Sequence, residues 1–188
     1  MKKLLFVLSL VLCISPIYAK GKNYIANDNV DTEGWRTITS IYENLYTNWG
    51  SAASDGLAAT VDPSGNITYF LKICFNEGKW TMDEGSILLL NLGDGSTIEL
   101  KSNYIGPADY EYQVSSYGTT YFVYPIYEIT EAQIQKIIDS DVTKIRVQWT
   151  GGTFDKDIKK KKLSKHLSNV YPAIKNALNQ EKTLYDDF

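Results

Sequence analysis

Hydrophobic and polar residues alternate most cleanly along residues 142–150. Ile145, Val147 and Trp149 fall on one side of an extended chain, and the charged and polar residues between them fall on the other. This period of two predicts a half-buried β-strand. Segments rich in β-branched and aromatic residues predict further strands, at residues 34–42, 56–61, 67–75 and 119–127.

The strongest hairpin pattern joins residues 86–92 and 97–101 through Gly93-Asp94-Gly95-Ser96. A two-residue loop would place Leu89 on the face of Leu100, opposite Leu88, Leu90 and Leu92. A three-residue loop would reverse this arrangement, and Ile87 and Leu89 would then be the side chains that lie on the other face. Either register puts large aliphatic side chains on both faces, which predicts a central strand covered on both sides.

Two helices are predicted late in the chain. Thr130-Glu131-Ala132-Gln133 has the spacing of a capping box, so a helix is expected to begin there and to end by 139–141. A second apolar stripe begins near Leu163, with Asp155 or Asp157 expected to cap its first turn. Pro172 lies within this stripe and predicts a kink, or a break near Tyr171.

Strands followed by helices favour an α+β fold, mainly an antiparallel β-sheet with a short capped helix and a C-terminal helix packed on it. The alternative is a β-sandwich with helical cover. Residues 31–182 are expected to form a single α+β domain. Residues 20–30 are expected to be a flexible lead-in, because they are polar, and residues 183–188 a frayed tail.

Residues 1–19 have the pattern of a signal peptide: basic Lys2-Lys3, the apolar run 4–14 and a small residue, Ala19, at the expected cleavage site. The run is too short to cross a membrane, since a spanning helix needs about 20 apolar residues, so no span is expected in the mature chain. Cys13 raises a lipoprotein alternative, and Leu12 argues against it. Export to the periplasm, cell surface or medium is therefore predicted.

The composition and charge of the chain limit the partners, cofactors and metal ions that can be expected. The 188 residues carry a net charge of −3, so no nucleic-acid partner is expected. One histidine and one cysteine beyond the signal peptide cannot build a zinc site, and no cofactor is expected. Asn27 to Glu33 only loosely resemble a calcium loop, so no metal is predicted. Cys74 is expected to be buried and inert, and His166 to lie at the surface or at the border of the apolar stripe without a catalytic role.

Charged residues give two weaker candidates. Neighbouring carboxylates could serve a hydrolase only if they faced others across a cleft; they occur at Asp83-Glu84, Asp109/Glu111, Asp155/Asp157 and Asp186-Asp187. The lysine run 159–162 is expected to be a solvated helix start, with an anionic envelope partner as the alternative.

Tyrosine is enriched, with 14 in the chain. Seven lie within one segment: Tyr104, Tyr110, Tyr112, Tyr117, Tyr121, Tyr124 and Tyr127. Tyrosine suits β-sheet packing, but a row of rings also suits stacking on a sugar or peptide. The candidate ligand-binding residues are Tyr104, Tyr110, Tyr112 and Tyr117, with a glycan, a peptide or an envelope component as partner.

Several of these segments follow one another in a recognisable order: 31–39, 85–100, 130–138, 143–147 and 157–161. In this order they resemble a group of small exported proteins of unknown function from Bacteroidetes-type bacteria. The resemblance implies a Gram-negative envelope setting and assigns no residue a catalytic role.

The expected function is a non-enzymatic binding or interaction domain that uses the Tyr-rich segment 104–127. Two alternatives stay open, a secreted hydrolase with a carboxylate pair and an envelope structural or assembly protein.

Overall fold

A computed structural model describes most of the chain beyond the predicted signal peptide. The described residues are 23–48, 51–75, 81–82, 85–102, 106–107, 110–115, 118–149, 151–159 and 161–183. Residues 1–22, which include the predicted signal peptide and Cys13, lie outside this description, as does the tail from 184 onward.

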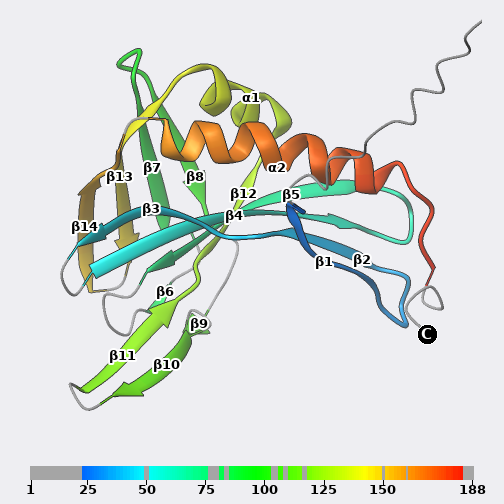
Figure 1. Ribbon diagram of the computed structural model, residues 1–188, viewed down its shortest axis with the longest axis horizontal. Helices are drawn as coiled ribbons and strands as arrows, with labels where there is room; N and C mark the ends of the chain where they lie inside the picture. Colours follow the sequence, from blue (N-terminus) through cyan, green and yellow to red (C-terminus); the bar gives the residue numbers. More distant parts are fainter. Residues whose placement is uncertain are drawn as a thin grey trace, which may run out of the picture.

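The fold is α+β and mainly antiparallel, as the sequence predicts (Figure 1). The fourteen strands of the described residues form three sheets. The largest sheet has the order β1-β2-β4-β5-β11-β10, with β3 also pairing with β4 and β12 with β5. A second sheet has the order β14-β13-β7-β8, and β6 pairs with β9.

The elements have the following bounds. The strands are β1 Ile25–Val30, β2 Arg36–Ser40, β3 Glu43–Asn48, β4 Ser51–Val61, β5 Ile67–Phe75, β6 Thr81–Met82, β7 Ile87–Leu92, β8 Thr97–Lys101, β9 Gly106–Pro107, β10 Tyr110–Ser115, β11 Gly118–Val123, β12 Ile126–Ile129, β13 Val142–Trp149 and β14 Gly152–Asp157. The helices are α1 Glu131–Asp139 and α2 Lys162–Leu178.

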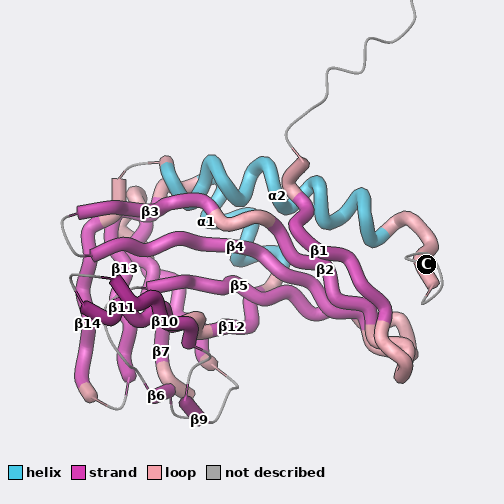
Figure 2. Tube along the Cα trace, turned by 60° about the horizontal axis from the view of Figure 1, so that its bottom comes forward, coloured by secondary structure: helices cyan, strands magenta, loops and turns pink. Residues whose placement is uncertain are grey.

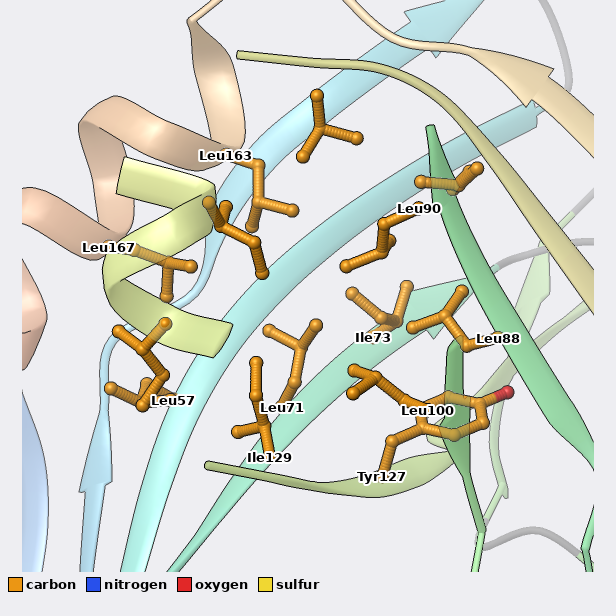
Figure 3. Close-up of a cluster of buried hydrophobic side chains, with 14 of the residues drawn as sticks. Leu57, Leu71, Ile73, Leu88, Leu90, Leu100, Tyr127, Ile129, Leu163 and Leu167 are labelled. Atoms are coloured by element: carbon orange, nitrogen blue, oxygen red, sulfur yellow. The ribbon is translucent and has the colours of Figure 1, made fainter. Parts of the chain in front are cut away.

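Both helices lie over one face of the large sheet, and the β10–β11 hairpin projects on the other side (Figure 1). The strands of the second sheet run across those of the first (Figure 2). Helix α2 packs against β1, β2, β3 and β4, and also contacts α1. One continuous core lies between the sheets and the helices, with side chains such as Leu57, Ile73, Leu90 and Leu167 meeting there (Figure 3).

Three hairpin turns share one design. In the turns that begin at Asp31, Asp62 and Leu92, the first residue's carbonyl accepts from the N–H of a glycine three positions later. That glycine has a φ of 85° or 86° in all three turns, a conformation that suits glycine. At β7–β8 this makes a three-residue loop, with Asn91 opposite Thr97, which is the second of the two predicted registers.

The register decides which face of β7 is buried. Leu88, Leu90 and Leu92 are buried, whereas Ile87 and Leu89 are only half-buried. The prediction that this strand is covered on both sides is therefore wrong. The strand is central in its sheet, but a single layer covers it.

The predictions for the first helix and its preceding strand end are confirmed. Thr130 accepts from the backbone N–H of Gln133, and the Gln133 side chain accepts from the N–H of Thr130. Ile129 and Ile134 are both buried beside this cap. The alternation in β13 is also confirmed, because Ile145 and Val147 are buried while Arg146 and Gln148 are exposed.

Three segments differ from their predictions. Residues 25–30, expected in the flexible lead-in, form β1. Residues 152–157, expected to lead into a helix, form β14 and pair with β13, so neither Asp155 nor Asp157 caps α2. Helix α2 begins at Lys162, close to the predicted start, and continues through Pro172, so the predicted break near Tyr171 is wrong.

Candidate functional site

A buried pair of titratable side chains lies where α2 crosses the large sheet. The Nδ1 atom of His166 is 2.7 Å from Oδ2 of Asp55, and the two side chains are 2% and 0% exposed. Asp55 Oδ1 and His166 Nε2 are buried without a hydrogen-bond partner within the described part of the protein. The hydroxyl oxygen of Tyr127 is a third such atom among the described residues, but only at Asp55 and His166 do two of them belong to one hydrogen-bonded pair.

The regular spacing of buried positions along β4 and along α2 brings Asp55 and His166 together. In β4, Ala53, Asp55, Leu57 and Ala59 alternate toward the interior and are all buried. In α2, His166 lies three residues after Leu163 and four before Val170, so it belongs to the buried helix face. His166 was predicted to lie at the surface or at the border of the apolar stripe, and the surface alternative is wrong because only 3% of the residue is exposed.

A cavity of about 560 Å³ lies beside this pair. This volume is within the usual range of about 300–1,000 Å³ for small-molecule sites. Its lining contains Tyr24, Glu43, Lys161, Lys162, Lys165, His166 and Asn169. The lining comes from α2, from the turn before it, from β3 and from the residue preceding β1.

The electrostatics of Asp55 reflect its burial. Loss of hydration raises the pKa of the Asp55 carboxyl to about 6, while the hydrogen bond from His166 acts in the opposite direction. Glu43, the direct cross-strand partner of Asp55 on β3, raises this pKa further. Two carboxylates from neighbouring strands and the only histidine of the chain therefore lie in one cluster.

The first turn of α2 is unusual for a helix. Its N-cap, Lys161, has a φ of 64° and makes no side-chain cap hydrogen bond, and no acidic residue lies in the first turn. The free N–H groups and the dipole of a helix give its N-terminus a partial positive charge. Lys161, Lys162 and Lys165 add like charge there, on the rim of the cavity.

The predicted tyrosine site is only partly described. Tyr104 and Tyr117 lie outside the described residues, and Tyr110 and Tyr112 lie on β10, where only the backbone is described. Their role in ligand binding stays a prediction. Two tyrosines further along are engaged within the protein: Tyr127 is fully buried, and Tyr124 packs edge-on against Tyr42 at 6.1 Å between ring centroids.

Two of the other candidates have structural explanations. Asp155 forms a bidentate ion pair with Arg146, with distances of 2.5 Å and 2.6 Å, and this pairing lowers the pKa of its carboxyl. Cys74 is buried, as predicted. No group of three or more histidine, cysteine or acidic side chains suited to a metal ion occurs among the described residues. Asp83-Glu84, Asp109 and Asp186-Asp187 lie outside them.

One sequence signal could have indicated the site. Asp55 interrupts the small and apolar inward positions of β4, where a carboxylate needs a buried partner. The chain's only histidine is the evident counterpart, but it is 111 positions away.

Comparison with known proteins adds no assignment. No family model, no curated protein and no solved structure matches the chain. Among the described residues, neither helix has the length and apolar character that crossing a membrane requires.

Proposed function

We propose that the protein is exported and acts as a non-enzymatic binding domain, with a small anion as the ligand of the cavity beside His166. Export follows from the signal-peptide pattern of residues 1–19. The observation that carries the binding role is the first turn of α2, where three lysines and an uncapped helix end converge on a cavity that also contains a buried histidine.

Charge explains why the ligand would be an anion. Helix N-termini bind anions through their N–H groups and dipole, and here lysines replace the acidic residues that usually stabilise such an end. Among the described residues of the lining, Glu43 is the one acidic side chain, against three lysines. Asp141 accepts from Ser164 Oγ of the first turn at 3.0 Å, and a bound anion would add negative charge beside the lysines on the side of the cavity.

Inorganic phosphate is a suitable probe, measured by isothermal titration calorimetry at low ionic strength. We expect saturable binding at a single site, and at least about a tenfold loss of affinity in Lys162→Gln/Lys165→Gln. Lys101→Gln is the matched control, because Lys101 is an exposed lysine on β8 that is absent from the lining. An equal loss in both variants would show a nonspecific effect of charge and would contradict the proposal.

A hydrolase is the second candidate, because Glu43 and Asp55 face each other across β3 and β4 beside the cavity. In that role His166, held by Asp55, would accept a proton from water. Turnover of chromogenic esters or glycosides that is lost in Glu43→Gln or His166→Gln would support it. Binding of phosphate without any turnover would favour the binding domain.

The Tyr-rich segment keeps a place in the proposal as a second contact surface. Tyr110 and Tyr112 lie on the β10–β11 hairpin, which projects from the sheet on the side away from the helices (Figure 1). A glycan array with the mature protein, beside Tyr110→Ala/Tyr112→Ala, tests this surface independently of the cavity.

A further inference from the structure

Three large apolar side chains are exposed in the described part of the protein, and two of them are aromatic and share one face of the large sheet. Trp35 is 43% exposed and Tyr42 is 41% exposed. Arg36, the neighbour of Trp35, donates to carbonyls of α2, so strand alternation directs Trp35 to the face turned away from the helices. The third side chain, Ile67, alternates with the buried Tyr69 and therefore belongs to the helix side.

Gly56 shows that Tyr42 lies on the same face as Trp35. Its neighbours on β4, Asp55 and Leu57, are buried on the helix side, so a Cβ at Gly56 would point to the opposite face. There it would lie 3.3 Å from the ring of Tyr42. The ring of Tyr42 therefore fills the space that the glycine leaves, with Tyr124 packed edge-on beside it.

The two aromatic residues lie at opposite ends of one stretch of the sheet. Tyr42 contacts Gly56, whereas Arg36, next to Trp35, pairs with Val61 further along the same strand. A strand rises about 3.3 Å per residue, so Trp35 and Tyr42 are roughly 20 Å apart along β4. We call the surface between them the Trp35–Tyr42 face. Figure 2 brings this face forward, and no described element lies in front of its Trp35 end.

Hydroxyl and amide side chains occupy most of the Trp35–Tyr42 face. Cross-strand pairing arranges them in two rows across β1, β2, β4 and β5. The asparagines are exposed and the threonines are half-buried, so their polar groups are within reach of a ligand. The first row is Asn29, Thr37, Thr60 and Thr68, and the second is Asn27, Thr39, Ala58 and Phe70.

Charged side chains lie at the margins of this face. Asp31 and Asp62 lie in the hairpin turns, where their carboxylates accept backbone N–H groups of the same turns. Lys72 on β5 lies at the Tyr42 end, and Glu128 lies on β12. The two rows themselves carry no charge, so the centre of the face suits a neutral ligand.

Rings at both ends and hydrogen-bonding groups between them match the chemistry of a sugar chain. A pyranose ring has an apolar face that can stack on an aromatic side chain, and its hydroxyl groups both donate and accept, as do those of threonine. A protein partner would require a continuous apolar centre, which the threonines interrupt. We propose that the Trp35–Tyr42 face binds a neutral, linear oligosaccharide that extends from one ring to the other. This site lies on the opposite side of the sheet from the cavity and does not depend on an anion.

The test is isothermal titration calorimetry of the mature protein with neutral linear hexasaccharides of glucose, mannose and xylose, and with the corresponding disaccharides. A disaccharide cannot reach both rings, so we expect at least one hexasaccharide to bind at least about tenfold more tightly than its disaccharide. Trp35→Ala and Tyr42→Ala should each lower that affinity about tenfold, the effect of removing an aromatic anchor. Trp35→Phe and Tyr42→Phe should keep most of it.

Ile67→Ala is the matched control, because Ile67 is 48% exposed at the same end of the sheet but on the helix side. The hydroxyl groups are tested by Thr60→Val, which keeps the shape of the side chain and should lower the affinity about fivefold. Thr153→Val on the exposed part of β14 should leave the affinity unchanged. Urea denaturation of each variant separates a loss of binding from a loss of folding.

The results distinguish this site from the others. Failure of every neutral hexasaccharide to bind, or an equal loss of affinity in Ile67→Ala and Trp35→Ala, would overturn the inference. Glycan binding that is lost in Tyr110→Ala/Tyr112→Ala but unchanged in Trp35→Ala would also overturn it, because the ligand would then lie on the β10–β11 hairpin. Glycan binding without phosphate binding would overturn the proposed anion site and leave this inference standing.

Discussion

An ionisable pair lies between the large sheet and each end of α2, and the two pairs differ in how well their polar atoms are satisfied. At the C-terminal end, Arg36 donates to both carboxylate oxygens of Asp28, at 2.9 Å and 2.8 Å. It also donates to the backbone carbonyls of Ala177 and Gln180, at 2.9 Å and 2.7 Å. At the N-terminal end, Asp55 and His166 share a single contact and leave two buried polar atoms without partners among the described residues.

The difference separates a fully satisfied pair from one that lies beside the proposed binding site. Arg36 brings positive charge to the negative end of the helix dipole and fills the hydrogen-bonding capacity around it. The lysines near His166 bring positive charge to the positive end. Helix α1 shows that the chain can build an ordinary N-terminus, with the Thr130 cap and Glu131 in its first turn. The N-terminus of α2 differs from that of α1 because it has neither a side-chain cap nor an acidic residue in its first turn.

The largest predicted effect would come from disrupting the satisfied pair. Arg36→Met keeps the apolar stem but leaves Asp28 and two carbonyls without their donor, so we expect the free energy of unfolding to fall by about 3 kcal/mol in urea denaturation. Arg146→Met is the matched control, because its pair with Asp155 is exposed and should contribute little. Equal losses in the two variants would remove the distinction between the buried pair and a surface one.

The second prediction concerns Asp55 and pH. Its pKa is raised in the folded protein from 3.8 to about 6, so the folded state holds a proton that the unfolded state has lost between these values. Stability contributed by this group is present below pH 4 and lost as the pH rises through 6. Relative to Asp55→Asn, the wild type should lose at most about 3 kcal/mol over that interval, since one pKa unit is about 1.4 kcal/mol.

Denaturant titrations of both proteins at pH 4, 5, 6 and 7 check this. His166→Gln tests the direction of the pKa shift, because the hydrogen bond from His166 lowers the pKa of Asp55. Without that bond the loss should extend to higher pH. Parallel stability curves for the wild type and Asp55→Asn would show that Asp55 does not titrate in this range.

Local sequence patterns predicted the elements that local forces determine. The capping box at Thr130 and the alternation in β13 fix their elements with residues close in sequence. The strands β1 and β14 were missed because none of their residues is fully buried, so neither strand has a row of buried apolar positions. Pairing with β2 and β13 stabilises these two strands. The residues of a strand do not identify the strand that will pair with it, so this stabilisation cannot be read from the sequence of β1 or β14 alone.

The candidate site was missed for the same reason at longer range. The direction in which His166 points depends on where α2 begins. Lys161 precedes the helix in a left-handed conformation, and no capping side chain marks this start in the sequence. Asp55 lies in a strand that the sequence predicted only from residue 56 onward. Their contact requires both the register of β4 and the rotation of α2, and these are set by the whole core.

The third prediction contrasts the two helix starts. Thr130→Ala removes the hydroxyl that accepts from Gln133, so we expect a loss of about 1 kcal/mol in the free energy of unfolding, the usual value of a side-chain cap. Thr143→Ala serves as the control, because its hydroxyl makes only a long 3.3 Å bond to Asn91. The prediction fails if both variants lose the same stability, since the cap would then add nothing of its own.

The smallest effect has the opposite sign and tests why α2 begins as it does. Lys161 is the only non-glycine residue with positive φ in the described part of the chain. Lys161→Gly should raise the free energy of unfolding by up to about 1 kcal/mol, because glycine adopts this conformation without strain. The same variant should weaken phosphate binding, since it removes a charge from the cavity. Lys159→Gly, outside the helix and with an ordinary φ, should not gain stability. In functional sites a residue often lowers stability while its side chain binds the ligand. A gain in stability with unchanged phosphate binding would show that the strain at Lys161 is unrelated to the anion.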